Sequence, residues 1–199
     1  MKRVGLYFGT FNPIHIGHLV IANFMANHTD LDEVWLVVSP QNPMKKAKSL
    51  LPDHHRLRMA QLAIKENERL FVSDIEFSLA KPSYTYLTLR ALKEDFAEHQ
   101  FSLIMGEDNL RILSNWKNHE EILANYPIKV YPRLGDEEIE PLGHFKGDIE
   151  ICIAPLMKIS STFIRNSIRD HKDVRYLIPE PVINYVGSNF LYENEKDTK

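Results

Sequence analysis

The sequence predicts an α/β fold, a doubly wound parallel sheet with helices on both faces. Short runs that are apolar throughout alternate with longer segments of helical periodicity, which is typical of a parallel sheet buried on both sides. The chain has 199 residues, a length that suits one domain and needs no disulfide or metal to fold. Its apolar fraction of 44% is that of an ordinary globular protein.

The first half of the chain alternates strands and helices. Val4–Phe8 is a short apolar run and is expected to form the first strand. Gly17–His28 follows with apolar residues spaced close to a helical period, so it is expected to be a helix. Glu33–Val38 is apolar and rich in β-branched residues, as strands are. Asp53–Asn67 is expected to be a helix with its apolar residues near one face, and Leu70–Asp74 to be a weak strand.

The second half repeats this alternation. Thr85–Glu98 has helical periodicity, and Phe101–Gly106 is a strongly apolar strand. Two further strands are expected at Ile128–Tyr131 and Ile149–Ile153. A last helix should begin near Ser161, because Ser and Thr are preferred helix N-caps. We therefore expect one domain over residues 1–190, with a small helical part from about residue 159 and a charged tail at 191–199.

Composition excludes several classes of protein. The formal net charge is −3, which argues against a protein that binds nucleic acid through its charge. The longest apolar runs are too short to cross a membrane, and no signal peptide is evident. Cys152 is the single cysteine, so no internal disulfide is possible. It lies between two isoleucines, where we expect a buried strand residue, and the cysteine usage indicates a reducing, cytoplasmic compartment.

The most informative segment follows the first expected strand, at residues 9–18, and reads Gly-Thr-Phe-Asn-Pro-Ile-His-Ile-Gly-His. Ligands of parallel sheets bind at this carboxyl edge. Gly9 permits a tight turn, and Gly17 and His18 open a helix whose free N–H groups favour an anion. His15 and His18 can donate hydrogen bonds to phosphate oxygens. The alternatives are two surface histidines or a metal pair, which would need further ligands.

A second segment, Ile159–Arg165, follows the last expected strand and reads Ile-Ser-Ser-Thr-Phe-Ile-Arg. Ser161 and Thr162 would begin a helix whose first N–H groups face an anion. Arg165 lies one turn further and can bind phosphate oxygens with its forked guanidinium group. The alternative is an ordinary capped helix with a surface arginine.

These two segments resemble the first and second motifs of the HxGH nucleotidyltransferase superfamily, which shares the first motif with class I aminoacyl-tRNA synthetases. A synthetase is normally far longer, so the smaller adenylyltransferases fit the length better. The resemblance implies a Rossmann-like fold of the HxGH type. It also implies that the following residues of the two segments bind ATP: Gly9, Thr10, Phe11, His15, His18, Ile159, Ser161, Thr162 and Arg165.

Four further segments resemble bacterial nicotinate mononucleotide adenylyltransferases, so that the likeness runs from about Val4 to Val186. They are Pro43–Lys46, Pro82–Leu89, Met105–Asp108 with the segment around Trp116, and Tyr176–Val186. The resemblance implies a phosphate contact for Lys45 or Lys46, an adenine-nucleotide contact for Gly106 and Asp108, and mononucleotide contacts for Asn12, Lys45, Tyr84, Thr85 and Trp116. Arg133 lies where the family has an arginine, but its role is not assigned.

Each of these residues also has a simpler reading. The lysines could form a solvated basic loop, Ser83 or Thr85 could cap the following helix, and Asp108 could cap the next one. Trp116 could be a core residue, as we expect for Trp35. The sequence departs from the family at Met44, where histidine is common, and at Asn12, where many relatives have aspartate.

The resemblance implies that the 5′-phosphate of nicotinate mononucleotide attacks the α-phosphorus of ATP, giving nicotinate adenine dinucleotide and pyrophosphate in NAD biosynthesis. His18 would stabilise charge at the α-phosphate and His15 would position it. Lys45, with Ser161, Thr162 and Arg165, would hold the triphosphate. Mg²⁺ would be held mainly by substrate phosphates, without a dedicated protein site. A homo-oligomer is possible, and neither nucleic acid nor a membrane is expected as a partner.

Two other functions remain open from the sequence. The chain could be a nicotinamide mononucleotide adenylyltransferase or another small adenylyltransferase, since backbone N–H groups that recognise the nicotinate carboxylate leave little trace in side chains. It could also be a nucleotide-sensing regulatory module that kept the pocket without the reaction.

Overall fold

A six-stranded parallel sheet forms the centre of the protein. The computed structural model describes residues 1–40, 50–132 and 146–193. The strands lie in the order β3-β2-β1-β4-β5-β6 and every pairing is parallel, which confirms the predicted doubly wound sheet. Their bounds are β1 Arg3–Gly9, β2 Glu33–Val38, β3 Leu70–Ser73, β4 Gln100–Gly106, β5 Ile128–Tyr131 and β6 Ile149–Ile151. The order changes direction between β1 and β4, so a ligand crevice is expected where these two strands end.

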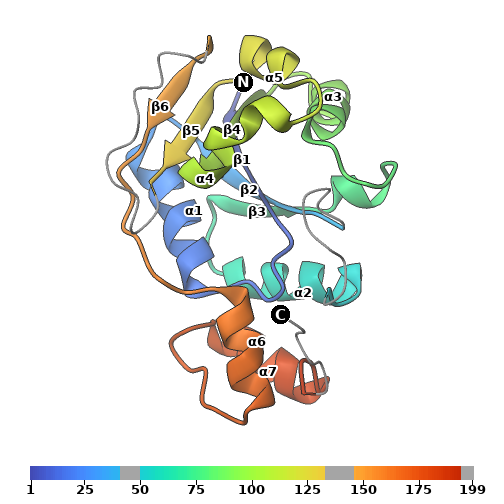
Figure 1. Ribbon diagram of the computed structural model, residues 1–199, viewed down its shortest axis with the longest axis vertical. Coiled ribbons are helices and arrows are strands. Elements are labelled where there is room, and N and C mark those ends of the chain that lie inside the picture. The colour runs from blue at the N-terminus through green and yellow to red at the C-terminus, as the bar shows by residue number, and fades with distance from the viewer. Residues whose placement is uncertain (41–49, 133–145, 194–199) are drawn as a thin grey trace.

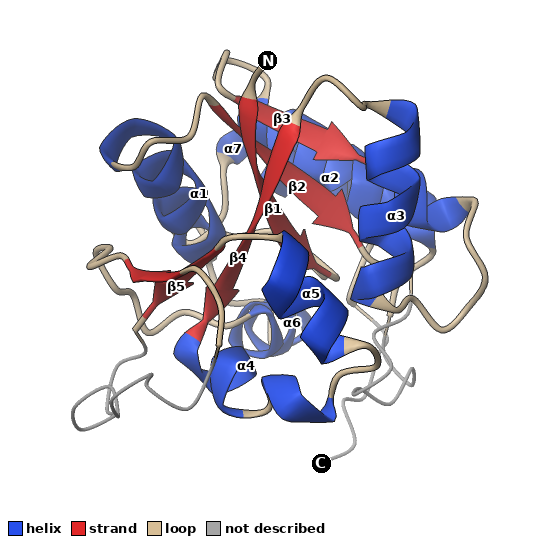
Figure 2. Ribbon diagram, turned by 90° about the horizontal axis from the view of Figure 1, so that it is seen from above, coloured by secondary structure: helices blue, strands red, loops and turns tan. Residues whose placement is uncertain are grey.

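Helices cover both faces of this sheet. The α-helices are α1 Ile16–His28, α2 Asp53–Ile64, α3 Thr85–Asp95, α4 Glu107–Arg111, α5 His119–Asn125, α6 Ser161–Arg169 and α7 Glu180–Ser188. Two 3₁₀ turns, η1 Ile75–Phe77 and η2 Leu113–Asn115, join them. Figure 1 shows α3, α4 and α5 on one side of the strands and α2 on the other, with α6 and α7 beyond it. Figure 2 shows the same layers from above.

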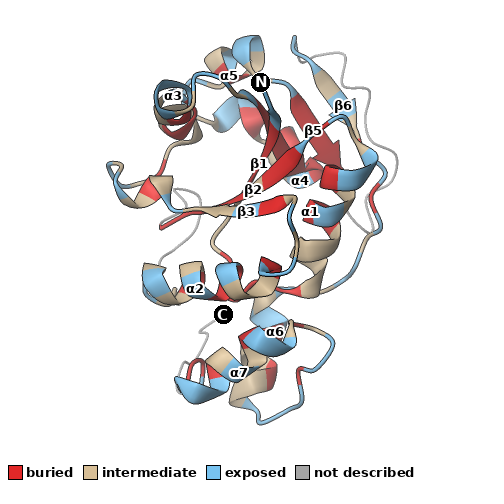
Figure 3. Cartoon of the chain, turned by 180° about the vertical axis from the view of Figure 1, so that it is seen from behind, coloured by how far each residue is buried: buried red, intermediate tan, exposed pale blue. Residues whose placement is uncertain are grey.

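The core is divided by the sheet into two layers, because successive side chains of each strand point to opposite faces. Val4 and Leu6 of β1 pack with the buried leucines of α3, whereas Tyr7 packs with the side of α1 and α2. Gly5 faces this second layer, where an added Cβ would lie 2.5 Å from Leu31 Cδ1. Figure 3 shows the buried residues concentrated along the central strands.

The structure differs from the sequence prediction mainly in short elements. Between β4 and β5 it has three helical pieces, α4, η2 and α5, each too short to produce a clear helical period. The second helix ends at Ile64 rather than Asn67. Leu191 and Tyr192 are buried, so the packed chain continues two residues past the boundary expected at 190. Among the described residues, no helix is both long and apolar enough to cross a membrane.

The burial predicted for Cys152 is confirmed, although the residue lies just outside the strand, and Trp35 is half-buried against the core. Cys152 is buried directly after β6, and its amide still donates to the Val130 carbonyl at 2.8 Å. Trp35 in β2 packs edge-on against Phe96 and Phe101. Neither residue is therefore available as a surface group for chemistry.

Candidate active site

The turn after β1 is closed by two histidines that cap α1 reciprocally. His15 is the N-cap residue, and its Nδ1 accepts the backbone N–H of His18 at 3.3 Å. In return His18 Nδ1 accepts the backbone N–H of His15 at 3.2 Å. The two rings stack with centroids 3.6 Å apart. This is a capping box built from imidazoles instead of the usual hydroxyl and carboxylate.

The reciprocal bonds assign the protons of both rings. A ring nitrogen that accepts a hydrogen bond carries no proton, so Nε2 of each neutral imidazole is the N–H donor. His15 is only 6% exposed, and burial lowers its pKa to about 4. His15 is therefore neutral at pH 7 and acts as a fixed hydrogen-bond donor, not as a cation.

Gly17 is needed for this geometry because the His15 ring lies over it. A Cβ added at Gly17 would stand 3.1 Å from His15 Nδ1 and 3.2 Å from its Cε1. Gly9 makes room in the same way for the buried ring of Phe11, which an added Cβ would meet at 2.7 Å. Phe11 in turn packs edge-on against His18, with centroids 5.1 Å apart. Both glycines thus permit ring packing that orients the histidine pair.

The second motif lies directly against the first, although about 150 residues separate them in sequence. Ser160 is the N-cap of α6 and accepts the Phe163 N–H at 3.2 Å, so the predicted helix start is confirmed. Ser161 Oγ donates to the Pro13 carbonyl at 2.9 Å. Arg165 Nη1 donates to the Asn12 carbonyl at 2.8 Å. Arg165 was expected to bind phosphate; the structure adds that part of its guanidinium group holds the Asn12–Pro13 turn.

Asn12 is a buried connector at the centre of this arrangement. Asn12 is 2% exposed. Its Oδ1 accepts the Tyr192 hydroxyl at 2.9 Å and the Leu51 N–H at 3.4 Å. The aspartate that the family resemblance associates with this position would bring a charge to the same place. An amide accepts these bonds without burying that charge.

Arg56 is a structural residue of the site that the sequence analysis missed. It is fully buried and its guanidinium group donates to the carbonyls of Thr10 and Ser39, both at 2.7 Å. It also donates to the Leu51 carbonyl at 3.0 Å and pairs with Asp53. These bonds fasten the ends of β1 and β2 to α2. A single arginine in a helical segment carries no local signal of such a role.

A cleft of about 710 Å³ opens at the carboxyl ends of β1 and β4. It brings together all eleven of the predicted ATP-binding residues, together with Asn12 and Trp116. Its lining includes Gly9, Thr10, Phe11, Asn12, His15, His18, Gly106, Asp108, Trp116, Ile159, Ser161, Thr162 and Arg165. The cleft therefore forms where the change in strand order predicts a crevice.

Some predicted residues lie elsewhere. Tyr84 and Thr85 do not line this cleft; Tyr84 is the N-cap of α3, and no side chain forms a cap there, so neither Ser83 nor Thr85 fills that alternative role. Lys45, Lys46 and Arg133 fall outside the described residues. Asp108 is not the N-cap of α4, a position held by Gly106.

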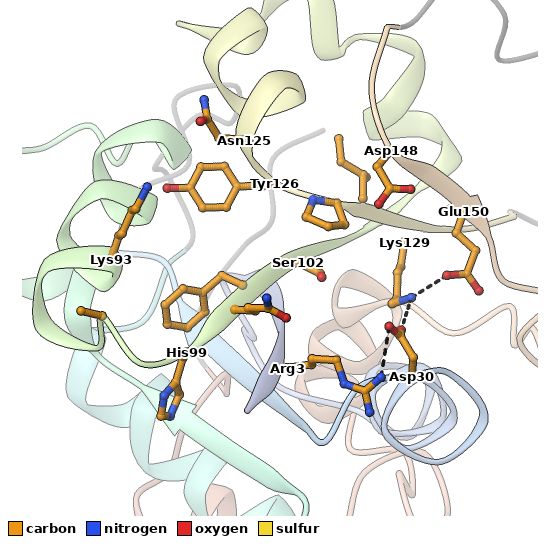
Figure 4. Close-up of a pocket in the computed structure, with 15 residues that line it drawn as sticks. Arg3, Asp30, Lys93, His99, Ser102, Asn125, Tyr126, Lys129, Asp148 and Glu150 are labelled. Carbon is orange, nitrogen blue, oxygen red and sulfur yellow. Dashed lines mark hydrogen bonds and ion pairs between the residues drawn. The ribbon is translucent and has the colours of Figure 1, made fainter. Parts of the chain in front are cut away.

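A second hollow, of about 390 Å³, lies at the opposite edge of the sheet, where β1, β4 and β5 begin. Several of its charged groups pair with one another, as Figure 4 shows for Lys129 between Glu150 and Asp30. Arg3 also pairs with Asp30, at 3.5 Å.

The side chains that line the cleft suit a Mg²⁺ ion that is held mainly by the phosphates of the substrate. The described residues contain no group of three or more His, Cys, Asp or Glu side chains placed to bind a metal. Asp108 is the carboxylate of the cleft lining. Mg²⁺ commonly takes one or two protein carboxylates and completes its shell with phosphates and water, so the residues present fit that mode.

Comparison with known proteins agrees with this site. A family model described as cytidylyltransferase-like matches residues 6–167. A relative from Flavobacterium johnsoniae, named "Probable nicotinate-nucleotide adenylyltransferase", is 52% identical over 193 residues, which is 96% of this chain and 99% of the relative. One from Cytophaga hutchinsonii with the same name is 50% identical, with 96% and 99% covered.

A solved structure of Plasmodium falciparum nicotinic acid mononucleotide adenylyltransferase complexed with NaAD has the same fold. Its TM-score is 0.82 at 22% sequence identity, with 98% of this chain and 99% of that chain covered. The family model, the relatives and the shared fold all extend across both phosphate-directed motifs. The chain belongs to the nicotinate-nucleotide adenylyltransferase family.

Proposed function

We propose that this protein transfers the adenylyl group of ATP to nicotinate mononucleotide, in NAD biosynthesis. A 5′-phosphate oxygen of the mononucleotide bonds to the α-phosphorus of ATP, and the bond to the bridging α–β oxygen breaks. The products are nicotinate adenine dinucleotide and pyrophosphate. The observation that carries the proposal is the contact of the two motifs, in which Ser161 and Arg165 hold the Asn12–Pro13 turn beside the histidine pair.

The reaction needs no protein nucleophile, because the attacking phosphate oxygen is already ionised. Cys152 fits this view, since it is buried and burial raises the pKa of its thiol to about 11. Catalysis then rests on alignment and on hydrogen-bond donors directed at the developing charge. The Nε2–H groups of His15 and His18 at the N-terminus of α1 are suited to that task.

The remaining contacts follow the family resemblance, and the cleft lining supports those that it includes: Gly106, Asp108, Trp116, Ser161, Thr162 and Arg165. Ser161, Thr162 and Arg165 at the start of α6 would hold the β- and γ-phosphates, together with Lys45. Gly106 and Asp108 would contact the adenine nucleotide at the end of β4. Trp116 would stack on the pyridine ring, which suits a flat, electron-poor group. Tyr84 and Thr85 would border the mononucleotide from the start of α3.

We further propose that the reaction requires Mg²⁺ and occurs in the cytoplasm. When bound, Mg²⁺ supplies positive charge that neutralises the triphosphate. Asp108 would be its protein carboxylate, and the phosphates and water would supply the other ligands. The cytoplasmic assignment rests on the single buried cysteine.

Steady-state assays with ATP, Mg²⁺ and each mononucleotide test the proposal. We expect pyrophosphate release with nicotinate mononucleotide, at a kcat/KM well above that for nicotinamide mononucleotide. Preference for nicotinamide mononucleotide would instead support a nicotinamide mononucleotide adenylyltransferase. Nucleotide binding without pyrophosphate release from either substrate would support the regulatory module and contradict an enzyme.

A further inference from the structure

A buried carboxyl group lies behind the segment assigned to the mononucleotide. Glu76, in η1, is 1% exposed. Its Oε1 accepts the hydroxyl of Thr88 in α3 at 2.7 Å, and Thr88 is fully buried. Its Oε2 is buried without a hydrogen bond to any residue that the structure describes. A carboxyl group in such a place costs stability, and the packing of η1 alone does not require one.

Glu76 lies near residues from the end of β2 and from the turn before α3. The hydroxyls of Ser39, which follows β2, and of Ser83 act on it together with Thr88. These hydroxyls favour the ionised form, but burial has the larger effect and raises the pKa of Glu76. Ser39 and Ser83 are each 8% exposed. The carboxyl group is thus hydrogen-bonded to the Thr88 hydroxyl, and the buried Ser83 hydroxyl near it has no hydrogen-bond partner among the described residues.

A short chain of contacts connects Glu76 to the cleft. The Thr88 hydroxyl that donates to Glu76 also lies 3.5 Å from the backbone carbonyl of Tyr84. On the other side of Tyr84, Lys117 Nζ stands 4.8 Å above the centre of its ring. Lys117 directly follows Trp116, which lines the cleft. The backbone of Tyr84 is therefore held from the Glu76 side, while its ring faces the Trp116–Lys117 segment.

We propose that Glu76 is a positioning residue that fixes the Ser83–Thr85 turn for binding of the mononucleotide. It acts through Thr88 and does not touch substrate. The proposal rests on the proposed function, because it concerns affinity for nicotinate mononucleotide. A turn displaced by about 1 Å can cost roughly a hundredfold in rate even when the change is remote from the chemistry.

The test compares KM for each substrate in paired variants. Glu76→Ala and Thr88→Val should raise KM for nicotinate mononucleotide by roughly tenfold or more, with KM for ATP within about twofold. Glu76→Gln and Thr88→Ser keep the hydrogen-bonding groups and should restore a KM near that of the wild type. Glu33→Ala is the matched control, since Glu33 is also a buried carboxylate of the β2 region (5% exposed) but bonds to Lys2 and Trp35.

The outcomes separate positioning from general stability. If Glu76→Ala lowers Tm as Glu33→Ala does and leaves the two KM values unchanged or shifts them equally, the residue is merely structural and the inference is wrong. Should Glu76→Ala not fold, Thr88→Val and Thr88→Ser provide the same comparison. If the wild type does not turn over nicotinate mononucleotide, the proposed function is wrong as well. If the wild type is active but the variants do not raise KM for nicotinate mononucleotide more than KM for ATP, only the inference is wrong.

Discussion

At the scale of single residues, His15 and His18 each serve the helix and the cleft at once. Each Nδ1 accepts a backbone N–H in the first turn of α1, so the proton of each neutral ring lies on Nε2. An ordinary capping residue would satisfy the same N–H groups but would place no donor beside the phosphates. The histidine pair therefore caps the helix and lines the cleft at the same time.

His18→Ala should lower kcat by about two orders of magnitude or more, because it removes a donor directed at developing charge. It also leaves the His15 N–H without its side-chain partner, so a loss of about 1 kcal/mol of stability is expected. Steady-state kinetics and thermal unfolding measure the two effects. Turnover within a few-fold of the wild type in the folded variant would show that His18 does not stabilise the reacting phosphate.

The buried His15 makes stability depend on pH in a defined direction. Its pKa falls from an ordinary 6.5 to about 4 on folding, so between these values the unfolded chain binds the proton more strongly. The stabilisation is complete above pH 6.5 and is lost as the pH falls towards 4, up to about 3 kcal/mol. Urea unfolding from pH 7 to pH 4 should show this extra loss relative to His15→Asn, which keeps an N-cap acceptor. Parallel stability curves for the two proteins would contradict the assignment.

Gly17→Ala should separate activity from stability. Alanine favours the helix by about 1 kcal/mol over glycine, but its Cβ would stand 3.1 Å from His15 Nδ1 and push the ring. We expect kcat/KM to fall by roughly tenfold or more while Tm stays near that of the wild type. Gly187→Ala in α7 is the matched control, since an added Cβ there meets nothing within 4 Å. It should raise Tm and leave the kinetics unchanged, and equal activity of both variants would show that Gly17 is not needed for the ring position.

At the scale of elements, α2 holds the ends of two strands through Arg56. Nη1 donates to the carbonyls of Thr10 and Ser39, Nε donates to the Leu51 carbonyl and Nη2 pairs with Asp53, a spread of donors that the single ammonium group of lysine cannot reproduce. The edge of the sheet that carries the cleft is therefore held in place by α2, although no residue of α2 lines the cleft.

Arg56→Lys should destabilise the protein by about 3 kcal/mol, because several buried carbonyls lose their donors and Asp53 loses a close partner. Denaturant unfolding measures the change. Arg58→Lys, on an exposed position of the same helix, should have no measurable effect. Equal stability of the two variants would mean that the strand ends do not depend on this spread of donors.

At the scale of the whole molecule, the C-terminal helices and the residues after them close onto the first turn. Ser161, Arg165 and Tyr192 all bond to Asn12 or Pro13. Figure 1 shows α6 and α7 as the part of the molecule beyond α2. Tyr192, near the end of the described residues, thus helps to hold the turn that follows β1 and lines the cleft.

Tyr192→Phe tests this closure. Loss of the hydroxyl donated to Asn12 Oδ1 should lower the free energy of unfolding by about 1 kcal/mol and lower kcat several-fold, since Asn12 lies in the cleft. Tyr176→Phe is the control, because Tyr176 is 90% exposed and its substitution should change neither quantity. A Tyr192→Phe protein with normal stability and kinetics would show that closure by the C-terminal residues is not required.

How much of the fold and of the site could be predicted depended on whether the sequence signal is local. The sheet, the start of α6 and the turn and helix start at residues 9–18 were predicted because apolar periodicity, glycines and capping residues act within a few positions. Between β4 and β5 only a short helix near Asp108 was suggested, and η2 and α5 were not, because α4 has five residues and α5 seven, which is two turns or fewer. Tyr84 and Thr85 show the limit of resemblance, since a motif identifies residues without showing which of them line a cleft.

The amino-acid sequence by itself determined the class of fold, the two motifs and the family resemblance, because each depends on residues that are close together in the chain. The tertiary structure alone decided that Arg56 braces the strand ends and that Arg165 and Tyr192 meet Asn12 across more than 150 positions. It also decided that Glu76 is enclosed behind the turn before α3. Such contacts depend on how helices pack on the sheet, and packing distances between remote segments leave no periodic trace in a single sequence.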